Sequence, residues 1–212
     1  MEVEVVIEIP QGSRNKYEMD HATGRFRLDR MLFTSTRYPL DYGFIPDTLA
    51  EDSDPLDAMV ILDEPTFPGC VVRARPVGVF WMSDEHGPDA KILAVPARDP
   101  RHAATRDLVD VPGHLTDEIG HFFDIYKELE PGKGTDVRGW QDRAAAEQVI
   151  EEAFTRARRS AVGPDQAHSL PDGSQRGHLG DTRGGGPASL RPAPAALSSR
   201  PKGGWIVRLS PR

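Results

Sequence analysis

The sequence of 212 residues predicts an α+β domain over residues 1–162 and a disordered C-terminal tail over residues 163–212. Three observations support this prediction. Short stretches of alternating apolar residues, separated by Gly, Pro and Asp, indicate strands between residues 3 and 95. From residue 114 the apolar spacing becomes that of helices. The tail contains 9 Gly, 7 Pro and 6 Ser, a composition typical of disordered segments.

The strands are expected in quick succession. VEVVIEI predicts a strand at 3–9 that stops at Pro10. A turn at 12–15 precedes a strand at 16–20, and the turn HATG leads into a strand at 25–29. Further strands are expected at 58–62, 71–81 and 91–95. Many short strands joined by such turns favour a small sandwich or a closed barrel.

Two helices are expected after the strands. In HLTDEIGHFFDIYKEL, five apolar side chains share one helical face: Leu115, Ile119, Phe122, Phe123 and Tyr126. A second helix is expected after Trp140, with Asp142 as its N-cap. Its apolar stripe consists of Val149, Ile150, Ala153, Phe154 and Ala157. Strands followed by segregated helices are typical of the α+β class.

Charge and composition exclude several classes of protein. The whole chain has a net charge of −7 and the tail of +4, so residues 1–162 carry −11. A domain this acidic is a poor binder of nucleic acid but is suited to divalent cations, or to anions masked by them. Cys70 has no second cysteine for a disulfide, and no apolar run is long enough to span a membrane. The N-terminus lacks a secretion signal, so we expect a soluble cytoplasmic protein.

The segment EDSDPLDAMV at 51–60 concentrates carboxylates. Asp52, Asp54 and Asp57 form the pattern D-x-D-P-x-D, in which the side chains repel one another unless a cation lies among them. Asp and Pro are also common in solvated turns. An EF-hand is excluded, because Leu56 and Asp57 stand where a ligand and a glycine would be required.

A second segment of the same kind, MSDEHGPDAK at 82–91, contains Asp84, Glu85 and Asp89. Two acidic segments at strand ends can converge at one end of a barrel. Oxygen ligands of this kind suit Mg²⁺, Mn²⁺ or Ca²⁺ and not zinc or copper. Spacing alone leaves open both a divalent metal site and a pair of acidic turns.

Cationic and aromatic residues form a second candidate group. Lys16 and Glu18 share one face of their strand, because alternate side chains point the same way. Taken singly, each cation fits an ordinary surface role and each tyrosine a core role. Together with metal-binding carboxylates they are what a polyphosphate needs. The group comprises Lys16, Arg30, Tyr38, Tyr42, Tyr126 and Lys127.

Ordered motifs over residues 1–160 resemble the soluble family I inorganic pyrophosphatases. They are IEIPQGSRNKYE, LDR, YPLDYGFIPDTL, EDSDPLDAMV, RPVGVF, DEHGPDAK and HFFDIYKELEPGK. D-x-D-P-x-D is that family's signature, and HATG and DEHG resemble its actinobacterial branch. The resemblance implies a five-stranded closed β-barrel of OB type with flanking helices, assembled as a homohexamer.

The resemblance also implies roles for individual residues. Asp52, Asp57, Asp84 and Asp89 would bind the metal pair, and Glu8 and Glu18 would bind further Mg²⁺ ions. The cationic and aromatic group would hold phosphate oxygens. Asp54 is the favoured general base, with Asp89 as the alternative. His21 and His86 would lie near the site, as modulators of activity or as polar loop residues.

The expected activity is Mg²⁺-dependent hydrolysis of inorganic pyrophosphate to two phosphates, by in-line attack of a metal-bridging hydroxide. Mn²⁺ is a candidate substitute for Mg²⁺, and neither nucleic acid nor a membrane is an expected partner. Two alternatives stay open. One is a two-metal phosphoesterase or nuclease, and the other is a cation-buffering or OB-fold binding module without activity.

Overall fold

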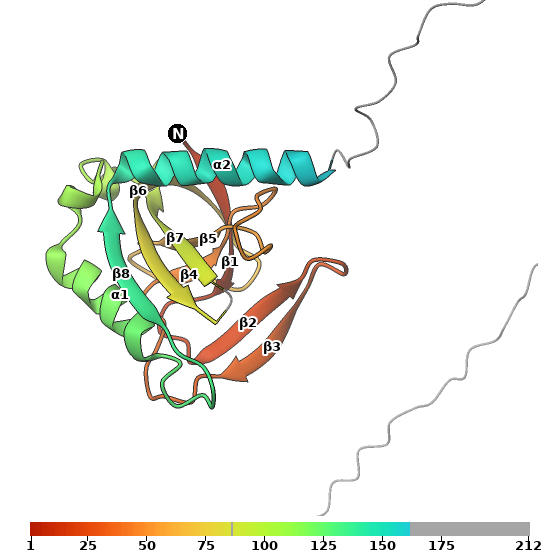
Figure 1. The fold of residues 1–212 in the computed structure, drawn as a ribbon. Helices are drawn as coiled ribbons and strands as arrows, with labels where there is room; N and C mark the ends of the chain where they lie inside the picture. Colours follow the sequence, from red (N-terminus) through yellow and green to blue (C-terminus); the bar gives the residue numbers. More distant parts are fainter. Residues whose placement is uncertain (86, 162–212) are drawn as a thin grey trace, which may run out of the picture. The chain divides into compact units, whose positions relative to one another are not determined.

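The structure of the chain is a computed structural model that describes residues 1–85 and 87–161 (Figure 1). The tail predicted over residues 163–212 lies outside the described residues, and so does His86. The division of the chain at residue 162 therefore stays a prediction.

A closed ring of five strands forms the centre of the fold. The strands are β1 (Val3–Ile9), β4 (Asp41–Phe44), β5 (Asp57–Val60), β6 (Val71–Asp84) and β7 (Gly87–Pro96). Hydrogen-bonded neighbours follow the order β1–β4–β5–β7–β6, and β6 pairs again with β1. The predicted five-stranded closed barrel is confirmed, and closure removes the free edges that an open sheet would expose.

The alternating pattern of β1 sets which side chains face the interior. Val3, Val5, Ile7 and Ile9 are buried, while Glu8 between them points to the other face. Gly43 on β4 lets the two strands approach closely. A Cβ atom there would lie 1.9 Å from the carbonyl oxygen of Val6. The packing of β1 against β4 thus requires glycine at this position.

Two strands were not predicted. β4 is a four-residue strand with every side chain buried, so it shows no alternation. The other, β8 (Asp136–Gln141), pairs with β6 outside the ring, and its register shifts near Gly139, which has a φ of 100°. Short or irregular strands show little alternation of apolar and polar residues in the sequence. Whether they form depends on pairing with neighbouring strands.

The second acidic segment belongs to strands rather than to a loop. The prediction ended one strand at residue 81 and began the next at 91, but pairing continues through Met82 with Asp89 and Asp84 with Gly87. The ladder of β6 and β7 therefore carries Asp84 and Asp89 at its end. The two strands are longer than predicted because cross-strand pairing extends them past the residues with favourable strand propensity.

A hairpin of β2 (Asn15–Asp20) and β3 (Arg25–Met31) forms a separate two-stranded sheet that extends beside the barrel (Figure 1). The predicted strands at 16–20 and 25–29 are confirmed within one or two residues. Lys16 and Glu18 form an ion pair, as their shared face predicts. The backbone N–H of Met19 donates to Glu8 Oε1 at 2.7 Å and ties the hairpin to β1.

Two helices cover the barrel. In α1 (Gly113–Ile125), the side chains of Ile119, Phe122 and Phe123 are buried. The helix ends at Ile125, Tyr126 is its C-cap, and Lys127 lies in the turn that follows. The Thr135 hydroxyl is 2.8 Å from the Phe123 carbonyl oxygen and 3.0 Å from that of Asp124, so it serves carbonyls that the helix leaves unpaired.

The second helix, α2 (Arg143–Ala161), lies across the barrel (Figure 1). Asp142 is its N-cap as predicted, because Asp142 Oδ1 accepts a hydrogen bond from the Ala145 N–H at 3.0 Å. Ile150 and Ala153 of the predicted stripe are buried, together with Ala146. Two short 3₁₀ turns, at Pro100–His102 and Leu108–Asp110, lie between β7 and α1.

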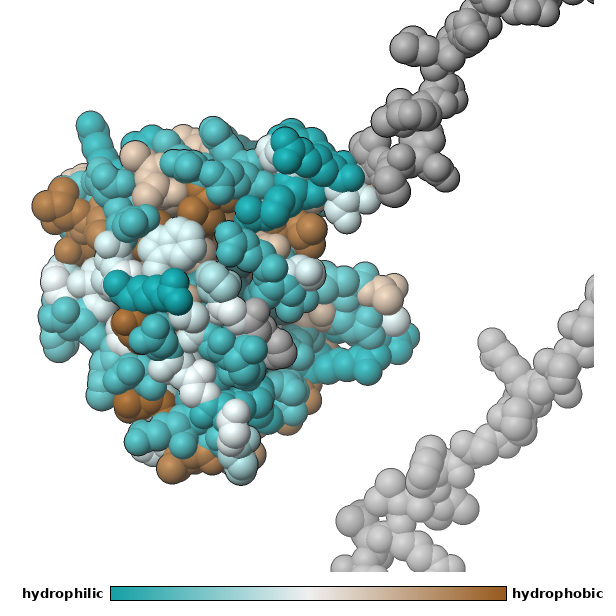
Figure 2. Space-filling view, viewed as in Figure 1, coloured by the Kyte–Doolittle hydropathy of each residue, from teal (hydrophilic) through white to brown (hydrophobic). Residues whose placement is uncertain are grey.

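The apolar residues form two clusters. One contains α1 residues with Tyr38, Tyr42 and Phe80, and the other contains α2 residues with β1, β5 and β7. On the face drawn in Figure 2, polar residues predominate and apolar side chains are scattered among them. None of the helices in the described part of the chain is long and apolar enough to cross a membrane.

Candidate active site

The two acidic segments meet at one cavity at the end of the barrel. Asp52 and Asp54 lie in the loop before β5, and Asp57 is the first residue of that strand. Because β5 runs parallel to β7, with Asp57 opposite Lys91, the beginnings of both strands lie at the same rim. The hairpin end of β6 and β7 brings Asp84 and Asp89 to that rim. The predicted convergence of the acids is thus what the structure shows.

Lys91 lies among these carboxylates with its side chain only 2% exposed. Its Nζ donates to Asp57 Oδ2 at 2.7 Å, to both oxygens of Asp89 at 2.8 and 2.9 Å, and to the Tyr42 hydroxyl at 2.9 Å. Burial by itself would lower the pKa of Lys91, but the surrounding carboxylates and the Tyr42 hydroxyl raise it well above its ordinary value. The ammonium therefore stays charged and offsets the repulsion between the two acids.

Two tyrosines pack behind the acids. The Tyr42 hydroxyl donates to Asp57 and lines the cavity. Tyr38 lines neither this cavity nor its neighbour, but packs against the Tyr42 ring with 5.4 Å between centroids. Burial raises the pKa of both phenols well above the ordinary value, so both remain protonated. Tyr38 thus supports Tyr42 from behind.

Cationic residues also line this cavity and form what we call its basic wall, and each is paired with an acid of the chain. Lys127 Nζ lies 2.7 Å from Asp84 Oδ2 and 3.6 Å from Glu85 Oε1. Lys16 pairs with Glu18. Arg30 pairs with Glu130 and with its neighbour Asp29, and Tyr126 completes this wall. The cavity therefore combines a cluster of carboxylates with a cluster of basic groups.

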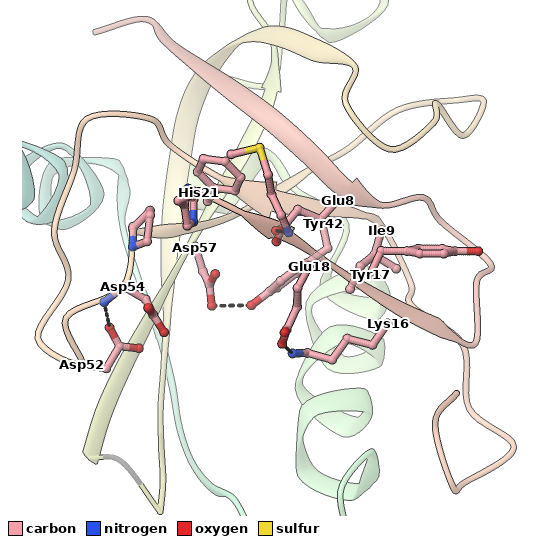
Figure 3. A pocket seen from close by; sticks show the side chains of 13 residues that line it. Glu8, Ile9, Lys16, Tyr17, Glu18, His21, Tyr42, Asp52, Asp54 and Asp57 are labelled. Carbon is pink, nitrogen blue, oxygen red and sulfur yellow. Dashed lines mark hydrogen bonds and ion pairs between the residues drawn. The ribbon is translucent and has the colours of Figure 1, made fainter. Parts of the chain in front are cut away.

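An adjoining cavity contains Glu8 and His21 and shares Asp52, Asp54 and Asp57 with the first (Figure 3). Burial raises the pKa of Glu8 from 4.5 to about 7, although the hydrogen bond from the Met19 N–H opposes this. The His21 ring packs edge-on against Phe44, with centroids 5.1 Å apart. His86, the other histidine predicted to lie near the site, falls outside the described residues.

Asp54 is an exposed acid of the loop before β5. Asp52 Oδ1 accepts a hydrogen bond from the Asp54 N–H at 3.1 Å, across Ser53, which has a φ of 76° (Figure 3). The Asp54 side chain is exposed and lines both cavities. Within the described residues its carboxylate accepts no hydrogen bond, so it is available to a water molecule.

Comparison with known proteins identifies the family. The family model for inorganic pyrophosphatase matches residues 5–158. The chain belongs to the inorganic pyrophosphatase family. The inorganic pyrophosphatase of Streptomyces coelicolor is 59% identical over 156 residues, which cover 74% of this chain and 96% of that relative. The inorganic pyrophosphatase of Corynebacterium glutamicum is 56% identical, over 74% of this chain and 98% of the relative.

Solved pyrophosphatase structures agree with the barrel. The Thermus thermophilus inorganic pyrophosphatase has a TM-score of 0.73 at 48% identity, covering 74% of this chain and 91% of that one. The Helicobacter pylori inorganic pyrophosphatase also has a TM-score of 0.73, at 43% identity, covering 74% of this chain and 94% of that one. The predicted family, with its actinobacterial relatives, the fold and the enzyme class of inorganic diphosphatase are confirmed.

Sequence reasoning missed Lys91, which lines this cavity, and Glu130, which pairs with the lining residue Arg30. In DAKILAVPA, Lys91 is the only charged residue of an apolar run and stands two positions after Asp89 on the same strand face. That placement is a usable signal for a buried cation beside an acid. Glu130 offered no such signal, because its partner Arg30 lies 100 positions away in the chain.

The acids fit hard divalent cations by the chemistry of their donors. All are carboxylate oxygens, the ligand type that Mg²⁺ and Mn²⁺ prefer. Burial raises the pKa of Asp52 and Asp89, which means that their negative charge is disfavoured there unless a cation compensates it. Within residues 1–85 and 87–161, no three potential ligands already form a metal cluster, and Lys91 and Lys127 pair with three of the acids.

Proposed function

We propose that this chain hydrolyses inorganic pyrophosphate to two phosphates in a Mg²⁺-dependent reaction, and so serves phosphate metabolism. The observation that carries the proposal is the convergence of two acidic segments and a basic wall on one cavity, in a chain of the pyrophosphatase family. Mn²⁺ would be a substitute, since it prefers the same oxygen ligands.

Asp52, Asp57, Asp84 and Asp89 would hold the metal pair, because all four line the cavity from one rim. Glu8 and Glu18 line the adjoining cavity and would hold ions that arrive with the substrate. When bound, Mg²⁺ would mask phosphate charge and lower the pKa of a water molecule from about 15.7 toward neutrality.

The basic wall would bind phosphate oxygens through Lys16, Arg30, Tyr42, Tyr126 and Lys127. Ammonium and guanidinium groups form short, charge-assisted hydrogen bonds with such oxygens. Lys127 and Lys16 pair with Asp84 and Glu18, two of the proposed metal ligands. When these carboxylates bind metal, the two lysines would become available to the substrate. Tyr38 would contribute through the position of Tyr42, since it lies behind that ring.

The attacking water must lose a proton, and Asp54 is our proposed general base. Its exposed carboxylate makes no hydrogen bond to another part of the described chain and borders both cavities. Asp89 is the alternative, but both of its oxygens accept hydrogen bonds from Lys91. An acceptor already engaged is less available to water, which favours Asp54.

We further propose a cytoplasmic homohexamer with no catalytic role for residues 163–212. Exposed apolar side chains on and after β3 support assembly, since such residues often mark subunit contacts. They are Leu28, Met31 and Phe33, each more than half exposed. Neither nucleic acid nor a membrane is proposed as a partner.

The activity is tested by measuring phosphate release from pyrophosphate, a nucleotide monoester and single-stranded DNA, each with Mg²⁺ and with a chelator. We expect release from pyrophosphate only, and only with Mg²⁺. Comparable release from the monoester or from DNA would favour a phosphoesterase or nuclease. Metal uptake without release from any of the three would favour a cation-binding module.

A further inference from the structure

Glu130 is a buried acid in the turn after α1. Its side chain is 4% exposed. Oε1 accepts a hydrogen bond from Arg30 Nε at 2.9 Å, and Arg30 Nη2 lies 2.9 Å from the same oxygen in an ion pair. Its other oxygen, Oε2, lies 3.3 Å from Lys133 Nζ. One carboxylate therefore contacts two of the basic groups that line the cavity.

The two ends of this contact belong to different parts of the fold. Arg30 lies on β3, in the hairpin that forms its own sheet, whereas Glu130 follows Tyr126 and Lys127 in the turn after α1. The backbone N–H of Glu130 donates to the Lys127 carbonyl at 2.8 Å, which holds Glu130 in a fixed relation to that lysine. The ion pair thus connects the hairpin to the turn that carries Lys127.

We propose that Glu130 is a positioning residue, which orients Arg30 and Lys133 toward the phosphate groups of the substrate. This inference rests on the proposed function, in which Arg30 binds a phosphate oxygen. Glu130 engages the Nε edge of the guanidinium, and Asp29 engages Nη1. The planar fork is thereby fixed in orientation before an anion arrives, which reduces the entropy lost on binding.

The direction in which KM for pyrophosphate changes when Glu130 loses its charge distinguishes a positioning role from a purely electrostatic one. Removing a negative charge close to an anion site would, through space, strengthen the binding of pyrophosphate. Loss of the guanidinium orientation would weaken it. A purely structural role would lower stability without a selective change in KM.

The test is Glu130→Gln, which keeps the shape of the side chain and removes its charge. We expect KM for pyrophosphate to rise about tenfold with a much smaller change in kcat, because a binding group is misplaced. The Mg²⁺ concentration for half-maximal rate is expected to stay unchanged. Glu130→Asp keeps the charge on a shorter side chain, and we expect an intermediate KM. Should Glu130→Gln fail to fold, a raised KM in Glu130→Asp supports the proposal.

The matched control is Glu128→Gln, an exposed acid on the same turn, which is expected to leave KM unchanged. Arg30→Lys is expected to raise KM, and adding Glu130→Gln to it should cause little further change, because the two residues act as one unit. An unchanged or lowered KM in a folded Glu130 variant, or fully additive effects with Arg30→Lys, would overturn the inference. An unchanged KM in Arg30→Lys would instead contradict the proposed role of Arg30, and with it the inference.

Discussion

At the scale of single residues, Lys91 is a buried cation among the acids of the cavity. Its ammonium is buried between Asp57 and Asp89 and faces the rings of Tyr42 and Phe123, 5.3 and 5.2 Å from their centroids. These two acids thus already share a cation supplied by the chain. The two carboxylates need this compensation unless another cation lies among them.

Lys91→Met preserves volume and removes the charge, which leaves two close carboxylates without a partner. We expect the free energy of unfolding, measured by urea denaturation with a chelator present, to fall by about 3–5 kcal/mol. Mg²⁺ should restore more stability to this variant than to the wild type. Arg138→Gln at an exposed position is the control, and equal stability of Lys91→Met and wild type would contradict the explanation.

Asp54→Asn tests the general base. We expect turnover to fall about 10²–10⁴-fold, because an amide cannot accept the proton from water. Calorimetric Mg²⁺ binding should persist, since the four proposed ligands remain. Glu51→Gln in the same loop is the control. Near-normal turnover of Asp54→Asn would contradict this role and favour Asp89 as the general base.

His21→Ala tests the proposed modulation. The His21 side chain lines the adjoining cavity and packs edge-on against Phe44. We expect the variant to differ from wild type in kcat or KM for pyrophosphate, measured by phosphate release with Mg²⁺. Kinetic constants equal to those of wild type would leave His21 as a polar loop residue packed on Phe44.

At the scale of elements, Asp107 caps both the 3₁₀ turn at Leu108–Asp110 and the start of α2. Asp107 Oδ1 accepts hydrogen bonds from the Leu108 N–H at 2.7 Å and from the Arg143 N–H at 3.0 Å. One carboxylate thus caps a 3₁₀ turn and the first residue of α2. These backbone donors lower the pKa of Asp107, the Arg143 N–H most of all.

Asp107→Ala removes both contacts, and we expect a loss of about 1–2 kcal/mol in the free energy of unfolding near pH 7. A lowered folded-state pKa means that the ionised form stabilises the fold above the ordinary pKa of 3.8. The difference between wild type and variant should therefore shrink as pH falls below that value. Urea denaturation from pH 7 to pH 3 measures it, and a difference that grew in acid would contradict the capping role.

At the scale of the whole molecule, the site requires contributions from the barrel, the hairpin and the turn after α1. The aspartates come from the loop before β5 and from β5, β6 and β7. Lys16 and Arg30 come from β2 and β3, and Lys127 and Lys133 follow α1. The described residues thus contain every proposed group except His86.

Ending the chain after residue 162 tests the proposed division. We expect kcat and KM for pyrophosphate to match those of the full chain, because no proposed ligand or base lies beyond that point. Sedimentation of both forms would show whether assembly also survives. A loss of turnover in a folded truncated chain would give the tail a role in catalysis.

The sequence by itself determined the strand-then-helix order, the family and the acids of both segments. These follow from local patterns, such as the alternation in VEVVIEI and the clustered carboxylates of D-x-D-P-x-D, which are legible without knowing any contact.

Only the tertiary structure decided the short strand at Asp41–Phe44 and the partners Lys91 and Glu130. The physical reason is the same in each case. Pairing and burial are set by residues distant in sequence, as Arg30 is from Glu130, and local propensity carries no information about them.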